Sequence, residues 1–342
     1  MALLKVQSLK KYFDVKDPFS GGRKTLKAVN GIDFSIEEDS IFALVGESGC
    51  GKSTVARLVL RLMQPTSGKI SFKDRDIFEL KDESLREFRR SVQIVFQDPF
   101  ASLNPRKTVY DAVSEPLKIH RIVEKQRMRE RVSEILKTVG LDSDVLDRYP
   151  HEFSGGQRQR ICIARALAVS PRLIVADEPL SALDVSIQAQ ILNLLRDIKE
   201  HSRVSFLFIS HDLNVVHYFS DNVGVMYLGK IVEQAKTEEL FERPLHPYTQ
   251  ILLASAPKIR VQTDKPRTPL YEPSAMGRRP NAELRTDIGE VPSPIDIPQG
   301  CPFHTRCPER FDPCDKIVPE LSEPVSKGIN SRLVSCHLWN PR

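Results

Sequence analysis

The residues with the clearest chemical potential form a glycine-rich stretch, GESGCGKST, at residues 46–54. The stretch matches the pattern G-x-x-x-x-G-K-[ST], in which glycines let backbone amides curl around a phosphate without a Cβ in the way. Lys52 is expected to reach the β- and γ-phosphates of a nucleotide, and the Ser53 hydroxyl to take one position on Mg²⁺. The expected phosphate-binding residues are Gly46, Glu47, Ser48, Gly49, Cys50, Gly51, Lys52, Ser53 and Thr54.

Two adjacent carboxylates follow in the stretch RLIVADEP, residues 172–179. The apolar run predicts a strand that ends at Asp177, and ligands bind at the carboxyl ends of strands in open α/β sheets. Asp177 is therefore expected to complete the Mg²⁺ shell, usually through water. Glu178 is expected to polarise an attacking water as the general base. The structural alternative for Glu178 is a salt-bridged acid at a strand end.

The elements that must position these groups follow from the hydrophobic pattern. Residues 40–46 predict a strand and residues 53–63 a helix, so the glycine loop lies between strand and helix, as its motif requires. Further along, helices predicted at 157–168, 186–201 and 213–220 alternate with strands at 172–177, 204–210 and 222–234. Strands that alternate with helices predict a parallel sheet with crossover connections.

Other segments flank this alternating region. Strands predicted at 3–13 and 26–36, joined across DPFSGGRKT, indicate a hairpin. Helical patterns begin near residue 82, and we assign an inserted helical subdomain to residues 98–165, approximately. Residues 258–300 are rich in proline and predict an extended linker, followed by a cysteine-rich lobe at 301–342.

Composition narrows the class of protein. The chain has 342 residues, of which 40% are apolar and 28% charged, as in a soluble globular protein. Its net charge of +5 is mild and no long basic run is present, so no nucleic-acid partner is expected. No stretch approaches about 18 consecutive apolar residues, and the N-terminus lacks the features of a secretory signal. The chain is expected neither to span a membrane nor to leave the cytoplasm.

The stretch FSGGQRQR, residues 153–160, resembles the signature motif of ATP-binding cassette (ABC) ATPases. The resemblance covers residues 1 to 257, approximately, as one ABC nucleotide-binding domain. It implies an α/β P-loop NTPase fold, with a RecA-like parallel sheet core, an antiparallel β subdomain and an inserted helical subdomain, plus a small Cys-rich C-terminal extension. In this family the signature contacts the ATP held by a second chain, which here implies Ser154, Gly155, Gly156 and Gln157. The other FSGG copy, residues 19–22, is expected to be a plain hairpin loop.

The remaining cassette motifs occur in the family order. Gln97 resembles the Q-loop glutamine, which binds Mg²⁺ and the attacking water, and His211 resembles the switch histidine, which contacts the γ-phosphate. Tyr12 resembles the aromatic residue that stacks on adenine, with Phe13 as the alternative. Residues 181–184 resemble the D-loop at the dimer interface: Ser181, Ala182, Leu183 and Asp184.

Two C-terminal stretches, HPYTQILLASAP at 246–257 and GCPFHTRCPERFDPC at 300–314, resemble the oligopeptide and dipeptide permease ATPases of the peptide and nickel importer branch. The resemblance implies an ATP-hydrolysing subunit that energises peptide import from the cytoplasmic face of the inner membrane, as a peripheral protein. It implies a second ABC ATPase subunit, commonly a different chain, two membrane permease subunits and an extracytoplasmic substrate-binding protein. Import of nickel or another small solute is an alternative.

Other classes of ABC protein fit less well. ATPases that act on ribosomes or DNA usually carry two cassettes or a long coiled coil, and exporters usually fuse the cassette to transmembrane helices. None of these three features is evident in this sequence.

The tail holds cysteines in the spacing C-x5-C-x6-C, with a further cysteine after 21 residues, at Cys301, Cys307, Cys314 and Cys336. Paired CxxC knuckles are absent, so a zinc ribbon fits poorly, and disulfides are disfavoured in the cytosol. Thiolates followed by proline suit a [4Fe-4S] cluster, which the family resemblance also implies. Zinc, with His304 or His337 as a substitute ligand, and unmetallated thiols remain open.

Overall fold

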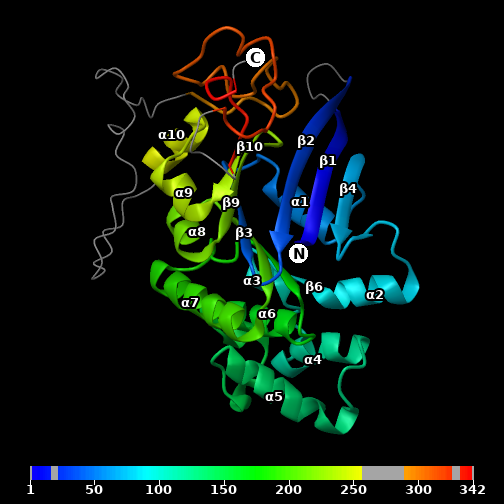
Figure 1. The fold of residues 1–342 in the computed structure, drawn as a ribbon. Coiled ribbons are helices and arrows are strands. Elements are labelled where there is room, and N and C mark those ends of the chain that lie inside the picture. Colours follow the sequence, from blue (N-terminus) through cyan, green and yellow to red (C-terminus); the bar gives the residue numbers. More distant parts are fainter. Residues whose placement is uncertain (1, 17–21, 256–288, 326–331, 341–342) are drawn as a thin grey trace.

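The computed structural model describes residues 2–16, 22–255, 289–325 and 332–340. Most of the first FSGG copy and residues 258–288 of the predicted linker lie outside the described residues. Figure 1 shows the described chain as two sheets with helices around them, and the cassette fold predicted from the sequence is confirmed.

The main sheet has seven strands in the order β11-β10-β9-β3-β8-β7-β6. The strands from β9 to β6 run parallel, as the alternation of strands and helices predicts, whereas β10 and β11 add antiparallel pairs at one edge. The bounds are β3 Ile41–Val45, β6 Val92–Val95, β7 Leu173–Asp177, β8 Ser205–Ser210, β9 Asn222–Tyr227, β10 Lys230–Lys236 and β11 Leu333–Val334.

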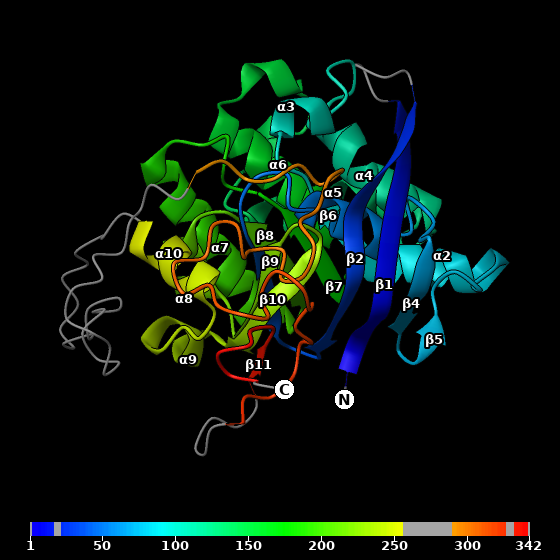
Figure 2. The same ribbon diagram turned by 90° about the horizontal axis from the view of Figure 1, so that it is seen from above.

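Both faces of this sheet are covered, which explains why its strands are apolar throughout. Successive residues of β3 alternate between two buried clusters: Ala43 joins one, and Phe42 and Leu44 join the other. Figure 2 shows the N-terminal sheet on one side of the main sheet and the helices α7 to α10 on the other. Helix bounds are α1 Lys52–Val59, α7 Val185–Ser202, α8 Leu213–Phe219, α9 Thr237–Glu242 and α10 Pro247–Ser255.

The N-terminal sheet is antiparallel, in the order β2-β1-β4-β5. The predicted hairpin is confirmed, because Lys16 at the end of β1 pairs with Arg23 at the start of β2. The stacked rings of Phe34 and Phe42, with centroids 4.9 Å apart, join this sheet to the main one. The strands are β1 Ala2–Lys16, β2 Arg23–Glu37, β4 Ser67–Phe72 and β5 Arg75–Asp76.

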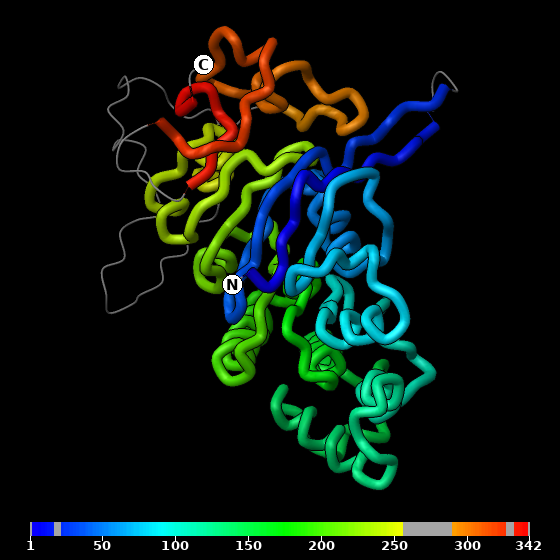
Figure 3. Tube along the Cα trace, turned by 45° about the vertical axis from the view of Figure 1, so that its right-hand side comes forward, coloured from blue at the N-terminus to red at the C-terminus, as the bar shows by residue number. Residues whose placement is uncertain are grey.

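A group of helices lies at the end of the molecule opposite the C-terminal segment (Figure 3). Helix α6 contacts α3, α4 and α5 in this group and also contacts α7 and β6, so it links the group to the main sheet. Within the described chain, no helix has the length and apolar character needed to cross a bilayer. The bounds are α2 Asp82–Ser91, α3 Pro99–Ser102, α4 Val109–Ile119, α5 Met128–Thr138 and α6 Gly155–Leu167.

The C-terminal segment is fastened to the edge of the main sheet. In β11, Val334 pairs with Glu233 of β10. The Glu233 side chain is fully buried, and its carboxylate accepts hydrogen bonds from the backbone N–H groups of Leu245 and His246 and from the Arg332 guanidinium at 2.9 Å. Burial raises the pKa of Glu233, and the guanidinium opposes that rise. The buried pair therefore joins the residue preceding β11 to β10.

We expect Arg332→Met to lower the free energy of unfolding by about 3–5 kcal/mol, because it leaves a buried carboxylate without its counter-charge. Urea unfolding followed by circular dichroism measures the change. Lys316→Met is the control, since Lys316 and Asp312 form an exposed ion pair whose loss should change the free energy of unfolding little. A loss from Arg332→Met no larger than that of the control would contradict the role of the buried pair.

Candidate active site

The glycine-rich loop connects β3 to α1 and fits tightly between two backbone segments. Gly46 and Gly51 have φ values of 152° and 112°, which favour glycine. A Cβ on Gly46 would lie 2.1 Å from the carbonyl oxygen of Met226, and one on Gly51 would lie 2.1 Å from that of Ala28. Glycine is therefore required at both positions, where the loop packs closely against β2 and β9.

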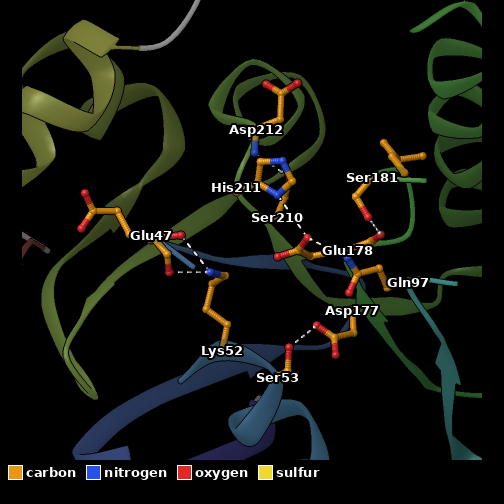
Figure 4. A network of polar contacts seen from close by, with 12 residues as sticks. Glu47, Lys52, Ser53, Gln97, Asp177, Glu178, Ser181, Ser210, His211 and Asp212 are labelled. Carbon is orange, nitrogen blue, oxygen red and sulfur yellow. Dashed lines mark hydrogen bonds and ion pairs between the residues drawn. The ribbon is translucent and has the colours of Figure 1, made fainter. Parts of the chain in front are cut away.

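Lys52 begins α1 and turns its side chain back beneath the loop (Figure 4). Lys52 is buried, with 4% of its surface exposed. Its ammonium donates hydrogen bonds to the carbonyl oxygens of Gly46 at 2.8 Å and Glu47 at 3.0 Å. The positive charge thus lies inside the loop whose amides and helix N-terminus favour a phosphate.

Ser53 and Asp177 bring together two oxygen groups suited to Mg²⁺. Ser53 lies in the first turn of α1 and Asp177 at the end of β7, and the Ser53 hydroxyl donates to the Asp177 carboxylate at 3.1 Å. Burial raises the pKa of Asp177, while the hydrogen bond from Ser53 lowers it. A cation at this position would favour the ionised carboxylate.

Glu178 lies at the centre of a second cluster (Figure 4). The Gln97 amide donates to Glu178 Oε2 at 3.4 Å, and His211 Nδ1 lies 3.1 Å from the same oxygen. Gln97 follows β6, Glu178 follows β7 and His211 follows β8, so adjacent parallel strands deliver the three side chains to one edge of the sheet. The cluster could position a water molecule beside a carboxylate base.

The backbone of Glu178 is unusual for a residue with a side chain. Its φ of 48° is in the left-handed region, which carries a strain of about 1–3 kcal/mol. The Glu178 N–H donates to the carbonyl oxygen of Ile209 at 3.0 Å, and Ser181 Oγ donates to the Glu178 carbonyl oxygen at 3.1 Å. These contacts hold the turn that aims the carboxylate away from the strand.

The predicted signature residues form the start of α6. Ser154 caps the helix: its hydroxyl accepts from the Gln157 N–H, and the Gln157 side chain accepts from the Ser154 N–H at 3.1 Å. A Cβ on Gly156 would lie 2.5 Å from the Ile187 side chain, so α6 and α7 approach closely there. A capped helix start of this kind favours an anion.

The predicted D-loop leads directly into α7. Asp184 is the N-cap residue of that helix, and Leu183 lies close to Gly155 of the signature. Ser181 contacts Glu178, as described above. The D-loop therefore contacts Glu178 through Ser181 and approaches the start of α6 through Leu183.

Tyr12 lies on β1, away from the clusters around Asp177 and Glu178. Its hydroxyl donates to the Asn30 side chain at 2.7 Å, and its partner in the strand pair is Lys27, next to Ala28. Because the carbonyl of Ala28 borders Gly51, Tyr12 is one strand removed from the loop. Its predicted contact with adenine stays a prediction.

A cleft of about 680 Å³ extends from this site toward the helix group. Ser53, Gln97 and Asp177 line it. Phe96 and Ile119, which are exposed apolar residues, also line it. The sequence analysis did not identify these apolar residues, because neither belongs to a motif.

Two contacts of the loop were missed by the sequence analysis. The hydroxyl of Tyr248 accepts a hydrogen bond from the Glu47 N–H at 3.0 Å, and the Arg306 guanidinium binds both oxygens of the Glu47 carboxylate. These pairs are separated by 201 and 259 residues along the chain, so no local pattern signals them.

The C-terminal cysteines lie in one lobe, where the Cys301 N–H donates to the Cys314 carbonyl oxygen at 2.8 Å. All are free thiols. Burial raises the pKa of Cys336 to about 12, and the three other thiols nearby add to the rise. Among the described residues, no group of three or more His, Cys, Asp or Glu side chains is arranged to hold a metal ion. The arrangement therefore does not support the predicted metal centre.

Comparison with known families gives two matches. Residues 29–181 match the ABC transporter family. Residues 232–279 and 273–314 match the family described as the oligopeptide/dipeptide transporter, C-terminal region. The second match spans Tyr248 and Arg306.

Similar proteins extend over nearly the whole chain. The oligopeptide transport ATP-binding protein AppF of Bacillus subtilis is 47% identical over 340 residues, covering 99% of this chain and 98% of that protein. The dipeptide transport ATP-binding protein DppF of Escherichia coli is 42% identical over 334 residues, covering 98% and 93%.

Solved structures match the cassette portion. The dimeric, post-hydrolysis ATP-binding cassette MJ0796 bound to ADP and Pi has a TM-score of 0.61 and 29% identity over 68% of this chain and 98% of that chain. The cbiO1 protein of Clostridium perfringens, part of the cbiONQ transporter complex, has a TM-score of 0.60 and 30% identity over 70% of this chain and 90% of that chain.

We expect Glu178→Gln to keep nucleotide binding but to slow hydrolysis by about 10²- to 10⁴-fold, because an amide cannot accept the proton of the attacking water. ATP turnover and nucleotide affinity of the purified assembly, with any second ATPase subunit's own site disabled, measure the two effects.

Glu200→Gln is a matched control, because Glu200 is exposed and pairs with Arg196 on α7. Its turnover should equal that of the wild type. Near-normal turnover by Glu178→Gln would exclude Glu178 as the base.

Proposed function

The chain belongs to the ABC transporter family, and we propose that it hydrolyses ATP to energise the import of oligopeptides or dipeptides. The observation that carries the proposal is the meeting of Ser53 and Asp177 beside the cluster of Gln97, Glu178 and His211. Relatives named oligopeptide and dipeptide transport ATP-binding proteins match almost the whole chain, which supports a peptide as cargo.

The residues divide the work of phosphoryl transfer among them. Lys52 and the amides of residues 46–54 bind the phosphates, with the Ser53 hydroxyl, Asp177 and Gln97 as the groups that would hold Mg²⁺. Bound Mg²⁺ would neutralise charge on the phosphate oxygens. Glu178 accepts the proton of water, and His211 holds the Glu178 carboxylate in line.

We propose that each ATP is shared between two cassettes, with the start of α6 of one chain facing the nucleotide of the other. The capped helix start at Ser154 and the 79% exposure of the apolar Val185, beside the D-loop, support such an interface. MJ0796, which matches in fold, is dimeric. We expect the partner to be a second, different ABC ATPase subunit.

The membrane partners would dock at the cleft beside Gln97. Exposed Phe96 and Ile119 offer apolar contact in its lining, and Gln97 connects that surface to Glu178. We propose two permease subunits there, an extracytoplasmic substrate-binding protein beyond them, and a peripheral position for this chain at the cytoplasmic face of the inner membrane. Tyr12 would stack on adenine.

We further propose that Cys301, Cys307, Cys314 and Cys336 carry a [4Fe-4S] cluster. The cysteine spacing supports it, although among the described residues no group of three or more His, Cys, Asp or Glu side chains is arranged to hold a metal ion.

After anaerobic purification we expect iron in the proportion of one cluster per chain, with the visible absorbance of an iron–sulfur centre, and less iron in Cys314→Ser. Zinc in place of iron would support the alternative ligand set. If neither metal is bound, or if Cys314→Ser keeps its metal content, the cysteines are ordinary thiols.

The transport proposal is tested by Gly155→Asp. The substitution places a carboxylate at the helix start that would face the γ-phosphate, so we expect ATP-driven association and uptake of labelled peptides to fall to background. Uptake by cells that contain the whole transporter measures the effect.

Gly21→Asp, in the other FSGG copy, is the matched control and should leave uptake unchanged. Equal losses from the two substitutions would refute the distinct roles of the copies. Uptake of nickel, with no uptake of peptides, by the wild type would refute peptide as the cargo.

A further inference from the structure

Glu47, the second residue of the glycine-rich loop, is held from three directions. The Lys52 ammonium donates a hydrogen bond to the carbonyl oxygen of Glu47 at 3.0 Å, and the Tyr248 hydroxyl accepts a hydrogen bond from the N–H of Glu47 at 3.0 Å. Arg306 binds its carboxylate through two nearly equal contacts, Nη1 to Oε2 at 2.9 Å and Nη2 to Oε1 at 3.0 Å. The loop is thus fixed at Glu47 by one group from α1, one from α10 and one from the C-terminal lobe.

The surroundings of Arg306 are those of an ordered ion pair and not of a surface contact. Its side chain is 9% exposed and that of Glu47 is 30% exposed. The guanidinium lies 5.8 Å from the ring centroid of Tyr227 and 5.9 Å from that of Phe303, and Nη1 reaches the Tyr227 hydroxyl at 3.5 Å. A bidentate ion pair in such an environment fixes both the orientation of the Glu47 carboxylate and its distance from Arg306.

The position of this pair has an electrostatic consequence. Glu47 follows Gly46 in the loop that would surround the phosphates, so a carboxylate there repels the anion unless a cation neutralises it. Lys52 uses its ammonium on the backbone carbonyls of the loop, whereas Arg306 neutralises the Glu47 carboxylate itself.

We propose that Arg306 is a positioning residue for the nucleotide site: through Glu47 it sets the shape and the charge of the phosphate-binding loop. The C-terminal lobe, which begins after the proline-rich segment, therefore takes part in ATP affinity although none of its residues needs to touch the nucleotide. The inference rests on the proposed function, namely that ATP binds at this loop.

The test compares ATP affinities of the full-length chain by titration with a fluorescent ATP analogue. We expect Arg306→Met to weaken binding about tenfold, because the Glu47 carboxylate then opposes the phosphates. Adding Glu47→Gln to Arg306→Met removes that charge and should restore affinity to within about twofold of the wild type. A residue with only a structural role would give losses that do not recover in the double variant.

Arg310→Met is the matched control, because Arg310 lies in the same lobe and forms an exposed pair with Asp315 at 3.0 Å. Its ATP affinity should equal that of the wild type. Arg306→Lys keeps the positive charge but cannot bind both carboxylate oxygens as a planar guanidinium does, so we expect a loss of ATP affinity smaller than that of Arg306→Met. This variant replaces Arg306→Met in the test if Arg306→Met does not fold.

Unchanged affinity in Arg306→Met, or in Arg306→Lys where only that variant folds, would overturn the inference. So would a double variant that binds no better than Arg306→Met. Failure of the wild type itself to bind the analogue would instead overturn the proposed function, so the two failures are distinct.

Discussion

The whole site depends on a steric constraint on the loop between β3 and α1. Carbonyl oxygens of β2 and β9 leave no space for a Cβ at Gly51 or Gly46, so only glycine lets the loop pack this closely against both strands. Helix α1 begins directly after Gly51, which places Lys52 and Ser53 in its first turn. From there the Ser53 hydroxyl reaches Asp177 at the end of β7.

The second requirement is that adjacent parallel strands end at the same level. Because β6, β7 and β8 are neighbours in the sheet, the residues that follow them meet without any long-range side-chain network. The strained left-handed backbone at Glu178 is stabilised by hydrogen bonds with nearby groups, since the neighbouring strand and Ser181 both bind its backbone. The fold therefore places the Glu178 carboxylate beside its neighbours through adjacent strands, and the strained backbone of Glu178 sets the direction of that carboxylate.

Sequence reasoning identified the parts of the site that are encoded locally. The loop at 46–54, the strand ending at Asp177 and the helix start at Ser154 each have a motif within a few residues, and the structure places them between the expected elements. Strands β4, β5 and β6 were not predicted, because they are short and partly exposed and show no clear alternation. The contact of Arg306 with Glu47 was missed for a different reason: complementary charges far apart in sequence carry no spacing signal.

The attachment of the C-terminal segment to the loop also has a consequence for how the protein is made. Glu47 leaves the ribosome long before Arg306, because the two residues are 259 positions apart and, at about 5–20 residues per second, synthesis over that distance takes roughly 13 to 52 s. During that interval the nascent chain has its phosphate loop but lacks the guanidinium that neutralises Glu47. The contact between Arg306 and Glu47 therefore forms only after most of the chain has been synthesised.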